Sequence, residues 1–142
     1  KGGIVVQGTN NVGLSLSKQM GANLIGNISN LNISVNGTEN IGILRRTDYA
    51  QTGNMVFTTS HIQNLNFGAN ASKSVLLRTD NGNITLDRDI TINSGLGNNI
   101  VLQANGAGTS VINNSGRTIT LDTGAKTSVG MLSSGSGSLE NK

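Results

Sequence analysis

The feature that most constrains the fold of this chain is an internal repeat of about 29 residues. A short apolar segment that ends in a glycine recurs five times, and its closing glycines lie 29, 31, 27 and 29 residues apart. The five copies occupy residues 4–8, 33–37, 65–68, 92–95 and 121–124. A fixed period in the range of roughly 20–50 residues is typical of solenoids, in which each repeat is one structural unit stacked on its neighbours.

Each repeat contains two further short apolar segments, so the sequence predicts three β-strands per repeat. The second segment recurs at residues 11–14, 40–43, 74–77, 99–102 and 128–131, and the third at 24–25, 55–57, 84–86, 111–112 and 139. Apolar and polar residues alternate in these segments, which is typical of strands with one buried face. We therefore predict an all-β fold, a right-handed parallel β-helix with three strands per turn and roughly five turns, or rungs.

In the glycine-ended segment, the alternation assigns one set of residues to the core and the next set to the solvent. The predicted inward column is Ile4, Ile33, Leu65, Ile92 and Leu121. The predicted outward column is Val5, Ser34, Asn66, Asn93 and Asp122. Equivalent residues of successive rungs are expected to stack on one another, because each repeat of a solenoid contacts its neighbours in the stack.

The composition fits a narrow core with many corners. Hydrophobic residues make up 35% of the chain but aromatic residues only 2%, so small aliphatic side chains are expected to fill the core. The chain has 20 glycines and 21 asparagines, the residue types that best tolerate the left-handed backbone of tight corners. It has no proline, which agrees with strands that are hydrogen-bonded on both sides. Stacked asparagines are also expected to form hydrogen-bonded ladders at the corners.

Length and charge narrow the classes of function. We expect residues 1–142 to form one β-helix segment of a longer solenoid, with strand edges that favour end-to-end self-association. The net charge of +3 comes from scattered residues, so we expect no nucleic-acid partner. No apolar run approaches the roughly eighteen residues of a membrane span, and no cysteine is present for disulfides or thiol chemistry.

The repeat also resembles that of a known family. The segments GTNNVGLSLS, GTENIGILRR and GAKTSVGMLS share a glycine, then polar residues, then Asn or Ser before an apolar strand. Over nearly the whole chain this style resembles the passenger repeats of Gram-negative autotransporter adhesins, in particular the large fusobacterial-type ones; haemagglutinin-like secreted adhesins share much of it. The resemblance implies an extracellular stalk or contact surface, exported across the outer membrane to the bacterial cell surface. It also implies attachment to a surface protein or glycan of host cells or other bacteria.

A tripeptide that occurs twice supplies the candidate contact site. Arg-Thr-Asp is found at residues 46–48 and 78–80, nine and ten residues after a closing glycine, so both copies are expected at one corner of adjacent rungs. Binding residues of solenoids often lie in such loops. The candidate contact patch is Arg45, Arg46, Asp48, Tyr49, Arg78 and Asp80. The sequence favours the alternative interpretation, a stacked and solvated set of ion pairs that contributes about 0–1 kcal/mol.

A carbohydrate-active β-helix enzyme, such as a polysaccharide lyase or hydrolase, is the alternative function. Asp87 and Asp89, on either side of Arg88, are the nearest candidates for catalytic carboxylates. The sequence indicates no further acid on the neighbouring rungs, so we expect no catalytic residues and no enzyme activity. His61 is the only histidine and has no Gly-x-Ser-x-Gly motif. The sequence shows no motif for a metal or a cofactor, and we expect neither.

Overall fold

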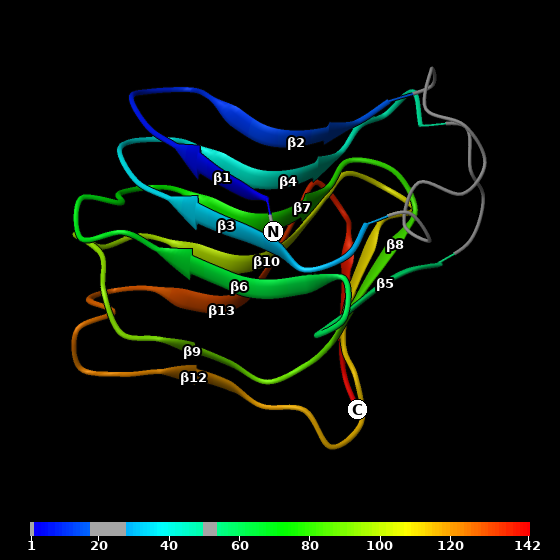
Figure 1. The fold of residues 1–142 in the computed structure, drawn as a ribbon. Helices are drawn as coiled ribbons and strands as arrows, with labels where there is room; N and C mark the ends of the chain where they lie inside the picture. Colours follow the sequence, from blue (N-terminus) through cyan, green and yellow to red (C-terminus); the bar gives the residue numbers. More distant parts are fainter. Residues whose placement is uncertain (1, 18–27, 50–53) are drawn as a thin grey trace.

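The computed structural model describes residues 2–17, 28–49 and 54–142. Within these ranges the chain forms fourteen β-strands, and all of their pairings are parallel. Successive turns of the chain stack on one another (Figure 1). The structure therefore confirms an all-β parallel solenoid with about 29 residues per turn. It has about four turns, because the sequence count of five included turns that the chain covers only in part.

The described strands form three faces, and each turn from β3 onward contributes one strand to each face. The first face consists of β1 (Gly3–Val6), β3 (Leu31–Val35) and β6 (Ile62–Phe67) in one sheet, followed by β9 (Ile90–Ile92) and β12 (Ile119–Leu121) in another. The second face consists of β2 (Val12–Leu16), β4 (Ile41–Arg45), β7 (Val75–Thr79), β10 (Ile100–Asn105) and β13 (Val129–Ser134). The third face consists of β5 (Asn54–Thr58), β8 (Asn83–Asp87), β11 (Ser110–Asn113) and β14 (Ser138–Asn141).

The three predicted segments of each repeat correspond to these three faces. All five copies of the second segment overlap strands of the second face. Four copies of the third segment fall in the strands of the third face, and the copy at 24–25 lies outside the described residues. The 29-residue period therefore locates the strands, because each turn of the solenoid repeats the same three-strand unit.

The predicted inward column is present on the first face. Ile4 faces Ile33, which faces Leu65, and in the second sheet Ile92 faces Leu121. Ile33, Leu65 and Ile92 are buried, whereas Leu121 remains 39% exposed. The outward column is confirmed by the partial or full exposure of Val5, Ser34, Asn66, Asn93 and Asp122.

On the second face the alternation is interrupted in the middle of each central strand. The runs of consecutive buried residues are Gly42 to Arg45 in β4, Val75 to Leu77 in β7, and Val101 with Leu102 in β10. The first strand residue, a Val or Ile, lines the outer surface in each case; Ile41 and Ile100 are partly exposed, and Val75 is 6% exposed. This local change of period produces the apolar surface described below.

A polar ladder holds the corner between the first and second faces. The backbone N–H of Asn11 donates to Asn40 Oδ1 at 2.8 Å, that of Asn40 to Ser74 Oγ at 3.1 Å, and that of Ser74 to Asn99 Oδ1 at 3.0 Å. The side-chain amides of Asn40 and Asn99 donate to nearby backbone carbonyls. Asn40, Ser74 and Asn99 are fully buried, so these bonds satisfy groups that water cannot reach. The predicted ladder is present, with contacts from side chain to backbone.

Candidate functional site

The structure divides the six predicted contact residues into a buried pair and an accessible group. Arg45 is 1% exposed and Tyr49 is 4% exposed. Arg45 Nη1 donates to the backbone oxygen of Asn83 at 2.9 Å, and the guanidinium carbon lies 5.3 Å from the centre of the Tyr49 ring. Burial lowers the pKa of Arg45, and its interaction with Tyr49 acts in the opposite direction. The prediction that Arg45 and Tyr49 lie on an exposed patch is wrong, since both belong to the packed interior.

The position of Arg45 follows from the register of the second face. Arg45 faces Leu16 in β2 and Thr79 in β7, and Thr79 faces Ala104 in β10. All four residues lie in one inward column and are buried. The sequence prediction placed Arg45 at the corner after the strand, whereas Arg45 is the last residue of β4 and its place in that strand directs it inward.

The other four predicted residues are accessible at the corner that follows the second face. Arg46 and Asp48 are exposed, and Arg78 and Asp80 are half-buried. Arg78 Nε donates to Asp80 Oδ1 at 2.7 Å, and Arg78 Nη2 donates to Asp80 Oδ2 at 3.3 Å. The two Arg-Thr-Asp tripeptides share this corner but do not align. Arg45 faces Thr79 and Leu44 faces Arg78, so the tripeptide at 46–48 is shifted by two residues relative to the one at 78–80. Whether these four residues bind a partner stays a prediction.

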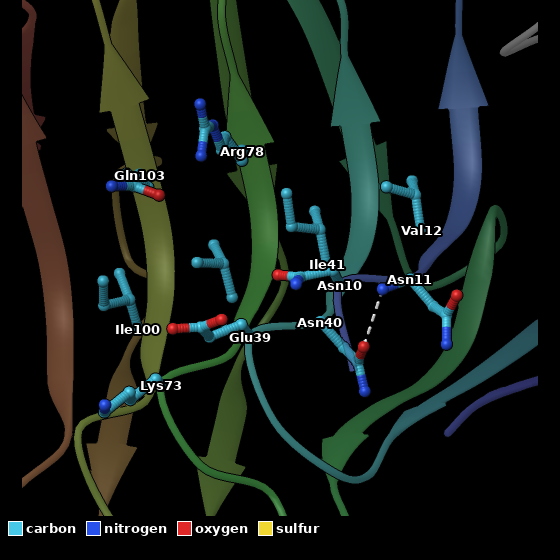
Figure 2. Close-up of a pocket in the computed structure, with 11 residues that line it drawn as sticks. Asn10, Asn11, Val12, Glu39, Asn40, Ile41, Lys73, Arg78, Ile100 and Gln103 are labelled. Carbon is cyan, nitrogen blue, oxygen red and sulfur yellow. Dashed lines mark hydrogen bonds between the residues drawn. The ribbon is translucent and has the colours of Figure 1, made fainter. Parts of the chain in front are cut away.

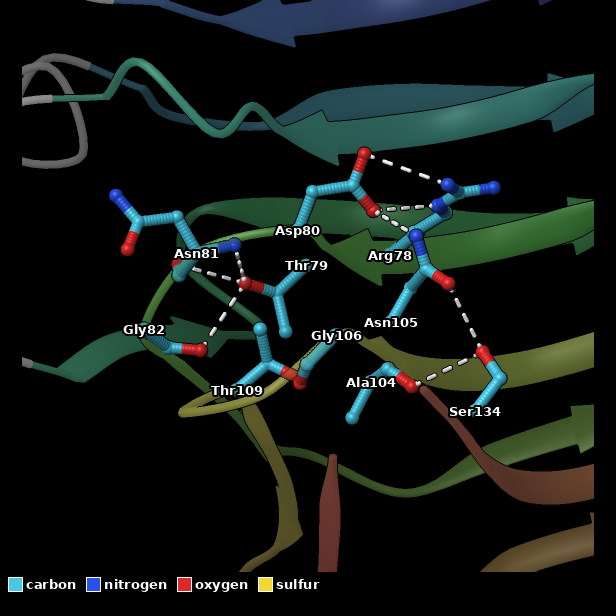
Figure 3. A network of polar contacts seen from close by, with 10 residues as sticks. All are labelled: Arg78, Thr79, Asp80, Asn81, Gly82, Ala104, Asn105, Gly106, Thr109 and Ser134. Atoms are coloured by element: carbon cyan, nitrogen blue, oxygen red, sulfur yellow. Dashed lines mark hydrogen bonds and ion pairs between the residues drawn. The ribbon is translucent and has the colours of Figure 1, made fainter. Parts of the chain in front are cut away.

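Asp80 is also the start of a network that crosses successive rungs (Figure 3). Asn105 Nδ2 donates to Asp80 Oδ1 at 3.0 Å, and Ser134 Oγ donates to Asn105 Oδ1 at 3.0 Å. Arg78, Asp80, Asn105 and Ser134 are thus joined into one corner network. A carboxylate that already accepts bonds from Arg78 and Asn105 is fixed in place, which is the behaviour of a structural ion pair.

The charged cluster at residues 87–89 joins three successive rungs. Asp87 Oδ1 accepts from Arg117 Nε at 2.9 Å, and Asp89 Oδ1 accepts from the backbone N–H of Thr118 at 2.8 Å, both on the following rung. In the other direction, the Arg88 guanidinium donates to backbone oxygens of β6 on the preceding rung. Each of these side chains therefore links its own rung to a neighbour.

The electrostatics of Asp87 do not resemble those of a catalytic acid. The hydrogen bond from Arg117, followed by one from Asn114, lowers the pKa of Asp87. A general acid in glycoside cleavage needs a raised pKa so that it holds a proton near neutral pH. The geometry of Asp87 thus supports a structural ion pair, and the catalytic alternative gains no support from it.

The second face carries an open groove of about 380 Å³ that runs across its strands (Figure 2). Its floor is a column of outward aliphatic side chains, one from each rung, that stack in register. These side chains are Val12, Ile41, Val75 and Ile100, and Val129 continues the column. We call this surface the aliphatic groove.

Polar residues flank the aliphatic groove on both sides. Arg78 and Gln103 lie on one side, and the corner residues Asn10, Glu39 and Lys73 lie on the other. Gln103 Oε1 is buried and has no hydrogen-bond partner within the part of the chain that the structure describes. The groove therefore offers an apolar floor and polar rims of both charge signs.

Sequence reasoning missed the aliphatic groove, although a signal for it exists. The first strand residue of the second segment is Val or Ile in every repeat. Simple alternation does not show that this residue points outward, because the two buried residues that follow it shift the period.

No family model, curated protein or solved structure matches the chain.

Among residues 2–17, 28–49 and 54–142, no three His, Cys, Asp or Glu side chains gather as a metal site would require. No helix there has the length and hydrophobicity to cross a bilayer. His61 lies in a turn, where its Nδ1 accepts a hydrogen bond from the backbone N–H of Thr58 at 3.2 Å.

Proposed function

We propose that this chain is a segment of an extracellular bacterial adhesin, exported across the outer membrane and displayed at the cell surface. It mediates or supports attachment to a protein or glycan of host cells or other bacteria. The observation that carries the proposal is the repetition of the aliphatic groove, in which successive rungs present equivalent Val or Ile side chains. A repeated linear surface suits many weak contacts that act together.

The solenoid architecture also supports a role in spacing. Parallel strands lie about 4.8 Å apart, so about four rungs add about 20 Å along the axis. The similarity of the repeat to autotransporter passenger repeats supports the same role, since a long stack of such rungs would extend a contact surface away from the cell.

Surface display of the chain tests the proposal. A non-adherent Gram-negative strain that displays residues 1–142 is expected to attach to epithelial cells or to other bacteria more than a strain that displays an unrelated solenoid of similar length. Equal attachment of the two strains to every cell type tested would contradict the proposal.

Two variants then locate the contact. Ile41→Asp places a charge on the floor of the aliphatic groove and is expected to reduce attachment if the groove makes the contact. Leu96→Asp is the matched control, because Leu96 is also accessible, at 60% exposure, but does not line the groove.

A further inference from the structure

The outward side of the first face differs in chemistry from the aliphatic groove. Its outward residues include six amides and hydroxyls in β3, β6 and β9 and directly after β9, namely Asn32, Ser34, Asn64, Asn66, Thr91 and Asn93. In register, Asn32 faces Asn64 and Ser34 faces Asn66. We call these six residues the amide face. None of them carries a charge.

Two hollows cover the amide face and share residues. The first, of about 270 Å³, lies over β1, β3 and β6, and the second, of about 340 Å³, lies over β6 and β9. Asn64 and Asn66 line both hollows. The two hollows therefore form one trough that crosses four strands and runs along the axis of the solenoid.

The side chains of the trough retain much of their hydrogen-bonding capacity. Asn64 Nδ2 donates to Asn32 Oδ1 at 2.7 Å, which fixes the orientation of both amides. Within the described residues, the side chains of Asn66, Thr91 and Asn93 make no hydrogen bond to the protein. Each primary amide offers two donors and an acceptor oxygen, so the trough presents several unused donors and acceptors on successive rungs along the solenoid axis.

The charged residues beside the trough are already engaged. Arg88 donates to backbone oxygens of β6, including that of Gln63 at 3.2 Å, and Asp89 accepts from the Thr118 N–H at 2.8 Å. The trough thus offers paired donors and acceptors but little free charge for a phosphate, sulfate or carboxylate. Val5, at 64% exposure, adds an exposed apolar side chain at one end. This pattern matches the hydroxyl groups of a neutral sugar.

We propose that the amide face binds a neutral glycan whose chain lies along the solenoid axis. The spacing supports this orientation, because neighbouring strands lie about 4.8 Å apart, close to the length of one hexopyranose unit in an extended chain. Each rung then presents its amides and hydroxyls to one sugar residue. This inference rests on the proposed adhesin function and adds to the aliphatic groove a second contact surface, on the first face, with its class of ligand.

Binding of the full chain to immobilised neutral hexose and N-acetylhexosamine oligosaccharides tests the inference, with heparin and hyaluronate as anionic probes. The chain is expected to bind at least one neutral series, with an affinity that rises with the number of sugar units. Asn66→Ala and Asn93→Ala should each weaken binding about fivefold, since each removes about one net hydrogen bond. Asn70→Ala, which changes an exposed asparagine outside the trough, should leave both the affinity and the thermal midpoint unchanged.

The outcomes separate the glycan inference from the adhesin proposal. Unchanged neutral-glycan binding in the Asn66→Ala, Asn93→Ala double variant, or binding of heparin and hyaluronate alone, would overturn the amide face as a glycan site. If displaying cells attach in a way that neither variant weakens, the adhesin proposal stands and the glycan inference fails. If displaying cells attach to nothing while the purified chain binds a neutral series through Asn66 and Asn93, the site stands and the adhesin role fails.

Discussion

Truncation of Arg45 is expected to destabilise the solenoid, because its guanidinium is an internal packing element. The change Arg45→Ala removes a hydrogen bond from a charged donor, worth about 1.5–3 kcal/mol, and a contact with the Tyr49 ring, worth about 1 kcal/mol. It also removes about two buried methylenes at about 0.8 kcal/mol each. The variant no longer buries a charge, which offsets part of this loss. We expect a net loss of about 3 kcal/mol.

Alanine at position 45 is too short to fill the space beside Gly82 that the Arg45 guanidinium occupies. A Cβ at Gly82 would lie 2.5 Å from Arg45 Nη2, so the guanidinium fills the volume that the glycine leaves open. Arg45→Met retains most of that volume without the charge, and we expect it to lose about 1 kcal/mol. Tyr49→Phe retains the ring and serves as a control that changes little.

Urea denaturation followed by circular dichroism measures these differences. With an m-value of about 2 kcal/mol/M, the expected loss for Arg45→Ala shifts the midpoint by about 1.5 M. A shift below about 0.3 M with an unchanged m-value would refute the reasoning, because it would mean that the guanidinium neither packs nor bonds as described.

Three further predictions concern residues with positive φ and the ion pair between Asp87 and Arg117. Gly37→Ala should lower the thermal midpoint more than Gly116→Ala. Both glycines have positive φ, but of the two only Gly37 has no room for a Cβ, which would clash with the backbone oxygen of Gly8 on the preceding rung. Equal losses would contradict this. Glu39→Asn should raise the unfolding free energy by about 0.5–1 kcal/mol, since Glu39 has φ 57° and asparagine tolerates this conformation better. Asp87→Asn should lower the thermal midpoint at pH 7, because the bond from Arg117 stabilises the folded state only when Asp87 is a carboxylate. The difference between the two proteins should vanish as the pH falls through the lowered folded pKa of Asp87. A difference that does not change with pH would argue against the ion pair.

Much of the fold could be predicted from the sequence because one spacing determines many contacts. The 29-residue period that aligns Ile4 with Ile33 also aligns the strands of the other two faces. The inward and outward columns of the first face followed from alternation. The solenoid is an arrangement in which local pattern and long-range pairing coincide, so a regular repeat is sufficient to predict it.

The candidate site was less predictable, because small shifts of register decide which side chains are accessible. The sequence pattern ended the strand before Arg45 and placed this residue at the corner, whereas its place in line with Leu16 and Thr79 directs it inward. The aliphatic residues Ile41 and Ile100 resemble core residues in the sequence, yet they face the solvent. A period-2 pattern does not reveal where a strand places two successive residues inside.

The corner ladder has a consequence for the way in which rungs assemble. The N–H of Asn11, Asn40 and Ser74 is in each case satisfied by a side chain of the next rung along the sequence. A rung therefore leaves a backbone donor without an acceptor, at a cost of about 1–3 kcal/mol when buried, until its C-terminal neighbour is in place. The following rung depends on the preceding one in the same way, because the N–H groups of Ile41, Val75 and Ile100 donate to the backbone oxygens of Asn11, Asn40 and Ser74. Two neighbouring rungs therefore complete each other's corner, so a corner becomes fully bonded only when both rungs are ordered together.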